Sequence, residues 1–377
     1  MRAEPPVPQD ALAAIRAPMM AAGADAADAP LLQPLGLLLD LAGEAMRARL
    51  FVVQAEGGAE ECLRPDFTVA IARRHIERGV ASGRYYYEGP AFRASPEADR
   101  PEEFVQLGVE LFAPGGGDTA PADAEIANLA WQSALAGGRS DLSLWLGDVG
   151  LFAPFIESLS LPAALAARLK RVAGRPRLLW AELSRAGQAT TPAGGGQLAA
   201  MLSGLSEAEA AALLEEVWAL AGVEPVGGRG PAEIAARLVR RAEAADAPAL
   251  TEDQAAAIRD FMAISEAPAA GLAKVRALAG RKGRALDAAL DAWTARLAAI
   301  AAVVPAERLR FAPALGHAFD YYDGLTFEVR SEALAADRPV AVGGRYDGLL
   351  ARLGAQADGR AVGCMVRPWR AFSGGES

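Results

Sequence analysis

Hydrophobic residues alternate with other residues along two neighbouring stretches of the chain, residues 84–94 and 103–112. Because side chains alternate across a strand, the apolar residues of the second stretch share one face. The opposite face is unusual, since Gln106 and Glu110 lie on either side of Gly108. We therefore predict two strands, and we expect the polar face of the second strand to look onto something other than bulk water.

Three blocks of the chain differ in pattern. Residues 1–152 mix helical and strand patterns, residues 153–304 carry Ala, Leu, Glu and Arg at helical spacing, and strand patterns return in residues 305–377. The first and last blocks predict one α+β unit with an antiparallel sheet flanked by helices, and the middle block predicts an inserted all-helical subdomain. A helix leading into a strand is predicted within 31–53, and a strand, a turn and a helix within 61–79. Further helices are predicted within 121–135, 206–222, 230–247, 251–264, 283–304 and 345–354, and further strands within 142–150, 308–315, 318–330, 339–344 and 361–366.

Composition is typical of a globular protein of about two or three domains. Of its 377 residues 52% are hydrophobic, yet no apolar run approaches the roughly 18 residues of a membrane span. The first block begins with acids and prolines where a signal peptide has a continuous apolar segment. We therefore expect a cytoplasmic protein with no membrane partner.

Few residues suit a disulfide scaffold or a metal site. Cys62 and Cys364 lie far apart, and the only histidines are His75 and His317. His75 lies in a charged helical stretch and is predicted at the surface. The net charge of −9, with no basic face, gives little support for binding to a nucleic-acid backbone. We expect no metal and no cofactor, whereas a small acidic or amino-acid ligand is compatible with this composition.

Polar side chains placed next to apolar strands predict a small-molecule site. A guanidinium suits a ligand carboxylate, and carboxylate, hydroxyl and amide oxygens accept from an ammonium group. Another carboxylate with a tyrosine hydroxyl can bind a polar ring, and Gly89 and Gly108 should leave room above the sheet. The candidates are Asp66, Thr68, Arg93, Gln106, Glu110, Tyr321, Tyr322 and Tyr346, with Asp320, Arg345 and Asp347 close by in sequence.

Each candidate also has an ordinary structural explanation. Arg93 alone fits a surface ion pair, Asp66 alone fits a helix cap, and Gln106 alone fits an amide facing water. The tyrosines fit core aromatics with hydrated hydroxyls. It is the joint order of these residues along the chain that favours a ligand site.

The order of five motifs resembles the catalytic domain of histidyl-tRNA synthetase, a class II aminoacyl-tRNA synthetase: LRPDFT, RYYYEGPAFR, EFVQLGVELF, FDYYDGLTFE and GGRYDGLL. The resemblance covers residues 20–152 and 305–370 and implies the class II synthetase fold. It implies histidine-pocket positions at Asp66, Thr68, Arg93, Gln106, Glu110, Tyr322 and Tyr346. Asp66 departs from the synthetases, which usually have Glu there.

Other positions depart from the synthetases where they bind ATP. His317 stands where they carry an arginine that polarises the reacting groups, and the loop after Arg93 places Glu102 and Glu103 where cations are expected. Each of these carboxylates would cost on the order of 1 kcal/mol or more against a triphosphate at short range. The closing motif has Pro and Trp in place of Gly-x-Glu-Arg. The chain ends seven residues after Arg370, so no anticodon-binding domain is expected.

This combination resembles a paralogous family, the regulatory subunits of ATP phosphoribosyltransferase, which catalyses the first step of histidine biosynthesis. The resemblance implies a non-catalytic chain that activates a short-form catalytic subunit and senses L-histidine for feedback inhibition. It implies a homodimeric core, with Pro34 at the interface, within a hetero-octamer, and no tRNA partner. Two alternatives remain open: a truncated histidyl-tRNA synthetase or histidine-activating ligase, and a scaffold with no ligand.

Overall fold

The structure is a computed structural model, and it describes residues 1–54, 57–173, 176–187, 209, 212–213, 216, 250–280, 283–316, 321–355 and 358–376. The helices predicted within 206–222 and 230–247 lie outside these ranges, apart from residues 209, 212–213 and 216, as do His317 and Asp320. Within the described ranges, no helix is long and apolar enough to cross a membrane.

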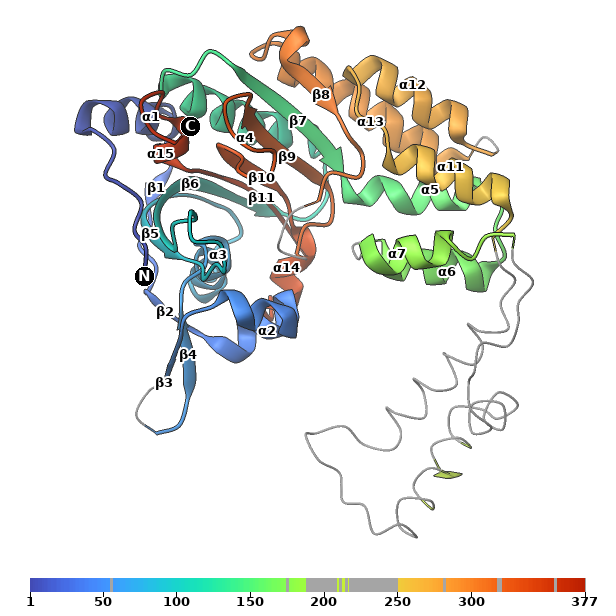
Figure 1. The fold of residues 1–377 in the computed structure, drawn as a ribbon, viewed down its shortest axis with the longest axis horizontal. Coiled ribbons are helices and arrows are strands. Elements are labelled where there is room, and N and C mark those ends of the chain that lie inside the picture. Colours follow the sequence, from blue (N-terminus) through green and yellow to red (C-terminus); the bar gives the residue numbers. More distant parts are fainter. Residues whose placement is uncertain are drawn as a thin grey trace. The chain divides into compact units, whose positions relative to one another are not determined.

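An eight-stranded sheet is the framework of the described chain (Figure 1). Across the sheet the strands are β1 (Asp25–Ala26), β5 (Gly83–Phe92), β6 (Glu103–Pro114), β11 (Gly359–Val366), β10 (Ala341–Arg345), β9 (Leu325–Ser331), β7 (Leu142–Asp148) and β8 (Leu309–Phe311). All pairs from β5 to β7 are antiparallel, and the edge pairs β1–β5 and β7–β8 are parallel. The predicted antiparallel sheet is confirmed, and its strands come from the first and last blocks.

The pair β5–β6 follows the alternation seen in the sequence. Tyr87 lies opposite Gly108, and Glu110 lies opposite Gly363 on the next strand, β11. Val109 falls on the other face, which α4 (Ala120–Ala136) covers by packing against β9, β10 and β11 (Figure 1). Glu110 is itself buried, at 1% exposure. The polar face of β6 therefore looks into the protein rather than into open solvent.

A smaller sheet of three strands follows the order β2 (Leu32–Pro34), β4 (Glu60–Leu63), β3 (Val52–Gln54). Helix α2 (Leu35–Ala42) starts directly after β2, and α3 (Thr68–Glu77) follows β4. The helix predicted within 31–53 is shared between β2, α2 and a 3-10 turn at Glu44–Arg49, and the strand predicted at its end is the start of β3. The other described helices are α1 (Gln9–Ala21), α5 (Phe152–Ser158), α6 (Ala163–Val172), α7 (Pro176–Leu183), α11 (Glu252–Met262), α12 (Pro268–Leu278), α13 (Arg284–Ala301), α14 (Asp347–Arg352) and α15 (Pro368–Ala371), with 3-10 turns at Val149–Leu151 and Ala306–Arg308.

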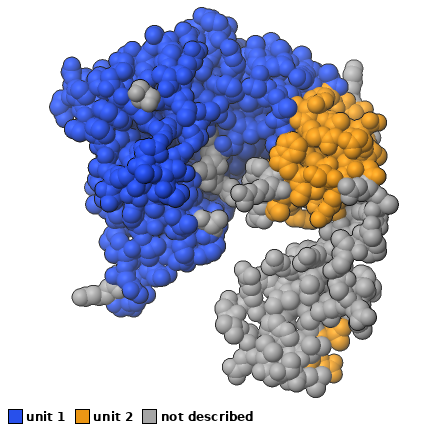
Figure 2. All heavy atoms as spheres, viewed as in Figure 1, with its two compact units in different colours: residues 1–154, 261–277, 284–377 blue, residues 155–260, 278–283 orange. Residues whose placement is uncertain are grey.

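The chain divides into two compact units (Figure 2). Unit 1 contains residues 1–154, 261–277 and 284–377, and unit 2 contains residues 155–260 and 278–283. Helix α13, from the predicted middle block, packs against α4 within unit 1 and buries Trp293 and Arg296. The division into residues 1–152, 153–304 and 305–377 stays a prediction.

The predicted surface position of His75 is wrong. Its side chain is 6% exposed, its ring stacks on Phe112 with centroids 4.3 Å apart, and its Nδ1 lies 3.1 Å from the Tyr85 hydroxyl oxygen. Burial, together with Arg78, lowers the pKa of His75 below its ordinary value. The charged neighbours in the sequence mislead because α3 buries only one of its faces.

Candidate ligand-binding site

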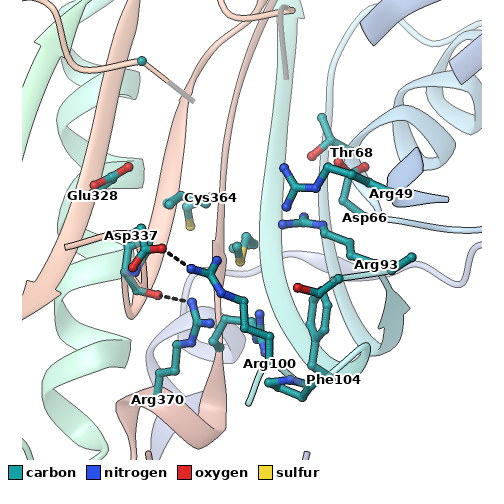
Figure 3. A pocket seen from close by; sticks show the side chains of 18 of the residues that line it. Arg49, Asp66, Thr68, Arg93, Arg100, Phe104, Glu328, Asp337, Cys364 and Arg370 are labelled. Carbon is teal, nitrogen blue, oxygen red and sulfur yellow. Dashed lines mark hydrogen bonds and ion pairs between the residues drawn. The ribbon is translucent and has the colours of Figure 1, made fainter. Parts of the chain in front are cut away.

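A cavity of about 950 Å³ lies on the polar face of β6, within unit 1 (Figure 3). Six of the eight predicted site residues line it: Asp66, Thr68, Arg93, Tyr321, Tyr322 and Tyr346. Gln106 and Glu110 do not line the cavity, but each contacts a residue that does. The structure therefore gathers residues from distant parts of the chain around one space.

Glu110 orients two hydroxyl groups at the cavity wall. The Thr68 hydroxyl donates to Glu110 Oε1 at 2.6 Å, and the Tyr346 hydroxyl donates to Glu110 Oε2. Burial raises the pKa of the Glu110 carboxyl to about 8, although these bonds oppose the shift. Glu110 thus acts on the cavity through Thr68 and Tyr346, where the sequence predicted a direct contact.

Glycines make the space that this cluster occupies. A Cβ at Gly363 would overlap the Glu110 carboxylate, and a Cβ at Gly108 would overlap the Tyr87 hydroxyl and the Cys364 carbonyl oxygen. The room predicted above Gly108 therefore exists, but it is filled by protein atoms rather than left for a ligand. At Gly89 the neighbouring Arg64 guanidinium takes the corresponding place.

Asp66 and Arg93 form the charged end of the cavity, together with Arg49 (Figure 3). Asp66 accepts from the backbone N–H groups of Thr68 and Val69, so it also caps the start of α3. Burial raises the pKa of Asp66 and lowers that of Arg93, and the opposite charge of each partner opposes the shift of the other. The helix-cap and ligand-site interpretations of Asp66 are therefore compatible.

At this site, two of the buried side-chain oxygens of the described residues have no hydrogen-bond partner. One is Asp66 Oδ2 and the other is Gln106 Oε1. The Gln106 amide nitrogen lies 3.7 Å from the sulfur of Met365, which lines the cavity. Because buried unsatisfied acceptors are costly, they favour a ligand that supplies donors.

Three tyrosines form an aromatic wall. The rings of Tyr321 and Tyr322 lie 4.7 Å apart, and each packs edge-on against Tyr346, at 5.7 and 6.2 Å. Burial raises the pKa of all three hydroxyls above the ordinary value, so they remain neutral donors near neutral pH. Such a wall suits a planar ring with polar edges.

Arginines line the opposite end of the cavity, and most of them already have acidic partners. Arg100 pairs with Asp337, as Figure 3 shows. Arg367 pairs with Glu4 and lies 3.5 Å from the centroid of the Phe104 ring. Burial lowers the pKa of Arg367 to about 9. Arg370 Nε pairs with Glu376 at 2.9 Å.

Glu102 and Glu103 were expected to repel a triphosphate, but this repulsion is not what distinguishes this end of the cavity from an ATP site. Neither residue lines the cavity, and Glu102 pairs with Arg2 at 3.3 Å. The backbone of the first residues also binds this loop, with Glu4 N–H donating to the Glu103 carbonyl oxygen at 2.8 Å. The N-terminal segment thus neutralises and holds the loop that follows β5.

Sequence reasoning missed several lining residues, above all Arg49, Arg100, Arg367 and Arg370. Arg49 comes from a 3-10 turn with no strand pattern, and its spacing from other charged residues is ordinary. No pattern in the sequence predicted a role for Arg370 in the site. Among the described residues, no group of three or more His, Cys, Asp or Glu side chains could hold a metal ion.

Comparisons with known proteins agree with this geometry. A family model described as histidyl-tRNA synthetase matches residues 10–227 and 231–368. A crystal structure of an ATP phosphoribosyltransferase regulatory subunit/histidyl-tRNA synthetase from Bacillus halodurans has a TM-score of 0.62 and 20% identity, covering 97% of this chain and 78% of that chain. The fold is that of the histidyl-tRNA synthetase class.

Curated relatives narrow this class further. An ATP phosphoribosyltransferase regulatory subunit of Mesorhizobium japonicum is 38% identical over 354 residues, which are 90% of this chain and 91% of the relative. The corresponding protein of Sinorhizobium fredii is 36% identical over 349 residues, with 89% of each chain covered. The chain belongs to the family of ATP phosphoribosyltransferase regulatory subunits.

Proposed function

We propose that this chain is a non-catalytic subunit that activates a short-form ATP phosphoribosyltransferase and binds L-histidine in the cavity on the polar face of β6. The observation that carries the proposal is the hydroxyl pair of Thr68 and Tyr346, held by the buried Glu110 beside Arg93 and Asp66. A guanidinium, an acidic acceptor and a set of oriented hydroxyls match the three polar groups of a free amino acid with an imidazole side chain.

Each part of the ligand has a partner in this arrangement. The α-carboxylate is placed on Arg93, where a guanidinium bonds a carboxylate bidentately. The α-ammonium is placed near Asp66, which lines the cavity and whose Oδ2 has no hydrogen-bond partner among the described residues. The imidazole is placed against the tyrosine wall, where the hydroxyls of Thr68 and Tyr346 meet its nitrogen atoms.

The other end of the cavity favours a binding protein over an enzyme that activates histidine with ATP. Arg100, Arg367 and Arg370 are paired with carboxylates of this chain, so a triphosphate would have to displace those partners. The ring of Phe104, a surface on which a nucleobase would stack, lies under the Arg367 guanidinium. Histidine-dependent exchange between ATP and pyrophosphate would overturn this assignment in favour of a histidine-activating enzyme.

Regulation requires that histidine bind one state of the assembly more tightly than another, because equal affinity shifts no equilibrium. The proposed assembly is a hetero-octamer built on homodimers of this chain, in the cytoplasm and without tRNA. Pro34 ends β2 on the small sheet and is exposed there, which leaves it free for the proposed dimer contact.

Titration calorimetry with L-histidine tests the cavity assignment. Arg93→Met should weaken binding by about tenfold to a hundredfold, since a charged hydrogen bond contributes roughly 1.5–3 kcal/mol. Arg84→Met is the matched control, because Arg84 lies on β5, the strand that ends directly before Arg93, and pairs with Glu125 instead. Equal histidine affinity in the Arg93→Met and wild-type proteins would refute the assignment.

A further inference from the structure

We propose that helix α13 controls the affinity of the cavity by holding Tyr346 in place through Arg296, Asp123 and Arg345. Arg296, Asp123 and Arg345 do not line the cavity, and none of the three is predicted to contact the ligand. The inference rests on the proposed function for the identity of the ligand, and on the geometry alone for the coupling.

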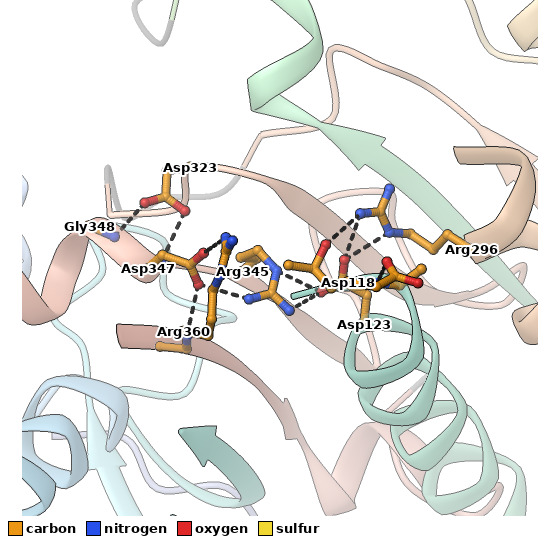
Figure 4. A network of polar contacts seen from close by, with 11 residues as sticks. Asp118, Asp123, Arg296, Asp323, Arg345, Asp347, Gly348 and Arg360 are labelled. Carbon is orange, nitrogen blue, oxygen red and sulfur yellow. Dashed lines mark hydrogen bonds and ion pairs between the residues drawn. The ribbon is translucent and has the colours of Figure 1, made fainter. Parts of the chain in front are cut away.

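Asp123, on α4, joins two arginines from distant parts of unit 1 (Figure 4). Its Oδ1 accepts from Arg345 Nε at 2.8 Å and Nη2 at 2.6 Å, and its Oδ2 accepts from Arg296 Nε at 2.8 Å. The Asp123 side chain is fully buried, and both arginine side chains are at most 7% exposed. Water therefore cannot take the place of either guanidinium group unless the surrounding side chains rearrange.

Arg345 carries this constraint to the cavity because of its place in the chain. It is the last residue of β10, and Tyr346 follows it directly. Arg345 reaches α4 on one face of the sheet, whereas the Tyr346 hydroxyl reaches Glu110 on the other. The side chains of Arg345 and Tyr346 thus form hydrogen bonds on opposite faces of the sheet, and these bonds fix the backbone between the two residues.

A second set of bonds fixes the segment after Tyr346. Arg345 Nη1 donates to Asp347 Oδ1 at 2.8 Å, and the same oxygen accepts from Ala361 N–H at 2.8 Å. Asp323 accepts from the backbone N–H groups of Asp347 and Gly348 at 3.1 and 2.6 Å, where α14 begins. The position of Tyr346 therefore depends on a connected set of charges (Figure 4).

Helix α13 is well placed to be the controlling element. A further polar contact of the helix is that of Trp293, whose Nε1 donates to Asp148 Oδ2 at 2.7 Å at the end of β7. The helix comes from the block of the sequence between the two sheet-forming segments, and it lies in unit 1. A shift of α13 would leave Asp123 with one guanidinium, and buried carboxylates require full compensation.

The test is a double-mutant cycle on histidine affinity in the full chain, with a structural readout of Tyr346. The variants are Arg296→Met, Tyr346→Phe and the double variant, with Arg296→Lys as the conservative substitution. The control is Arg276→Met, because Arg276 forms an exposed pair with Asp291 of α13 at 3.3 Å. The chain has six tyrosines, so fluorotyrosine labelling gives few ¹⁹F signals, and Tyr346→Phe assigns the relevant one.

We expect Arg296→Met to weaken histidine binding about tenfold and to shift the Tyr346 signal, with partial recovery in Arg296→Lys. Little further loss should appear when Tyr346 is already Phe, because coupled residues are not additive. Additive losses, or an unmoved Tyr346 signal in both Arg296 variants, would overturn the coupling. If neither Arg93→Met nor Tyr346→Phe changes histidine affinity while Arg296→Met still moves the Tyr346 signal, the proposed ligand fails, and only the structural coupling of α13 to Tyr346 stands.

Discussion

Replacing Glu110 by Gln should remove a large part of the pH dependence of folding stability. The pKa of Glu110 is raised from 4.5 to about 8 by burial, so the folded protein keeps a proton there that the unfolded chain has lost. Between these two values the folded state binds more protons than the unfolded state, and stability falls as pH rises.

The magnitude follows from the two pKa values. Between pH 5 and pH 8, this single group should lower the free energy of unfolding by at most about 3.5 kcal/mol, using roughly 1.36 kcal/mol per pKa unit. Glu110→Gln is neutral throughout and keeps an oxygen and a nitrogen near Thr68 and Tyr346. The free energy of unfolding of the Glu110→Gln variant should therefore not show this decrease as pH rises.

Urea denaturation at pH 5, 6, 7 and 8, at constant ionic strength, measures the difference between the two proteins. Other shifted groups, such as Asp66, contribute to both curves and largely cancel in that difference. The wild type should lose stability relative to Glu110→Gln as pH rises. Parallel curves would mean that Glu110 is already ionised in the folded protein at pH 5, and would refute the argument from burial.

Two further predictions concern packing and the N-terminal segment. Gly108→Ala should destabilise the protein by about 3 kcal/mol or more, since its Cβ would overlap the Cys364 carbonyl oxygen. The control Gly36→Ala has open space in α2 and should change stability by about 1 kcal/mol or less, as urea denaturation would show. Arg2→Ala should speed amide hydrogen exchange in the loop 94–102, because Arg2 Nε donates to the Arg100 carbonyl oxygen at 2.9 Å; unchanged protection would contradict that role.

The strands of the sheet were predictable because alternation is a local signal. The two-residue period of residues 103–112 places Glu110 and Val109 on opposite faces whatever the rest of the chain does. The antiparallel order and the gathering of Thr68, Glu110 and Tyr346 came from the resemblance, not from periodicity. Local pattern alone would not have brought these three residues together.

Other parts of the site depend on contacts that no local pattern reveals. The pairing of Glu4 with Arg367 joins the two ends of the chain, and both residues look like ordinary surface charges in sequence. The helix α1 was not predicted, because Pro18 interrupts an alanine-rich stretch whose burial rests on Ile15 and Met19. The surface position predicted for His75 was wrong because its burial depends on tertiary packing against Phe112 and Tyr85, which no local pattern reveals.

The central claim is that this chain confers both activity and histidine control on a separate catalytic subunit. The direct measurement is formation of phosphoribosyl-ATP by a short-form catalytic subunit, alone and mixed with this chain, across a series of histidine concentrations. We predict that this chain raises the rate and that histidine lowers it, with the inhibition lost in Arg93→Met and retained in Arg84→Met. A rate that does not change when this chain is added, or an activated rate that histidine does not affect, would contradict the account.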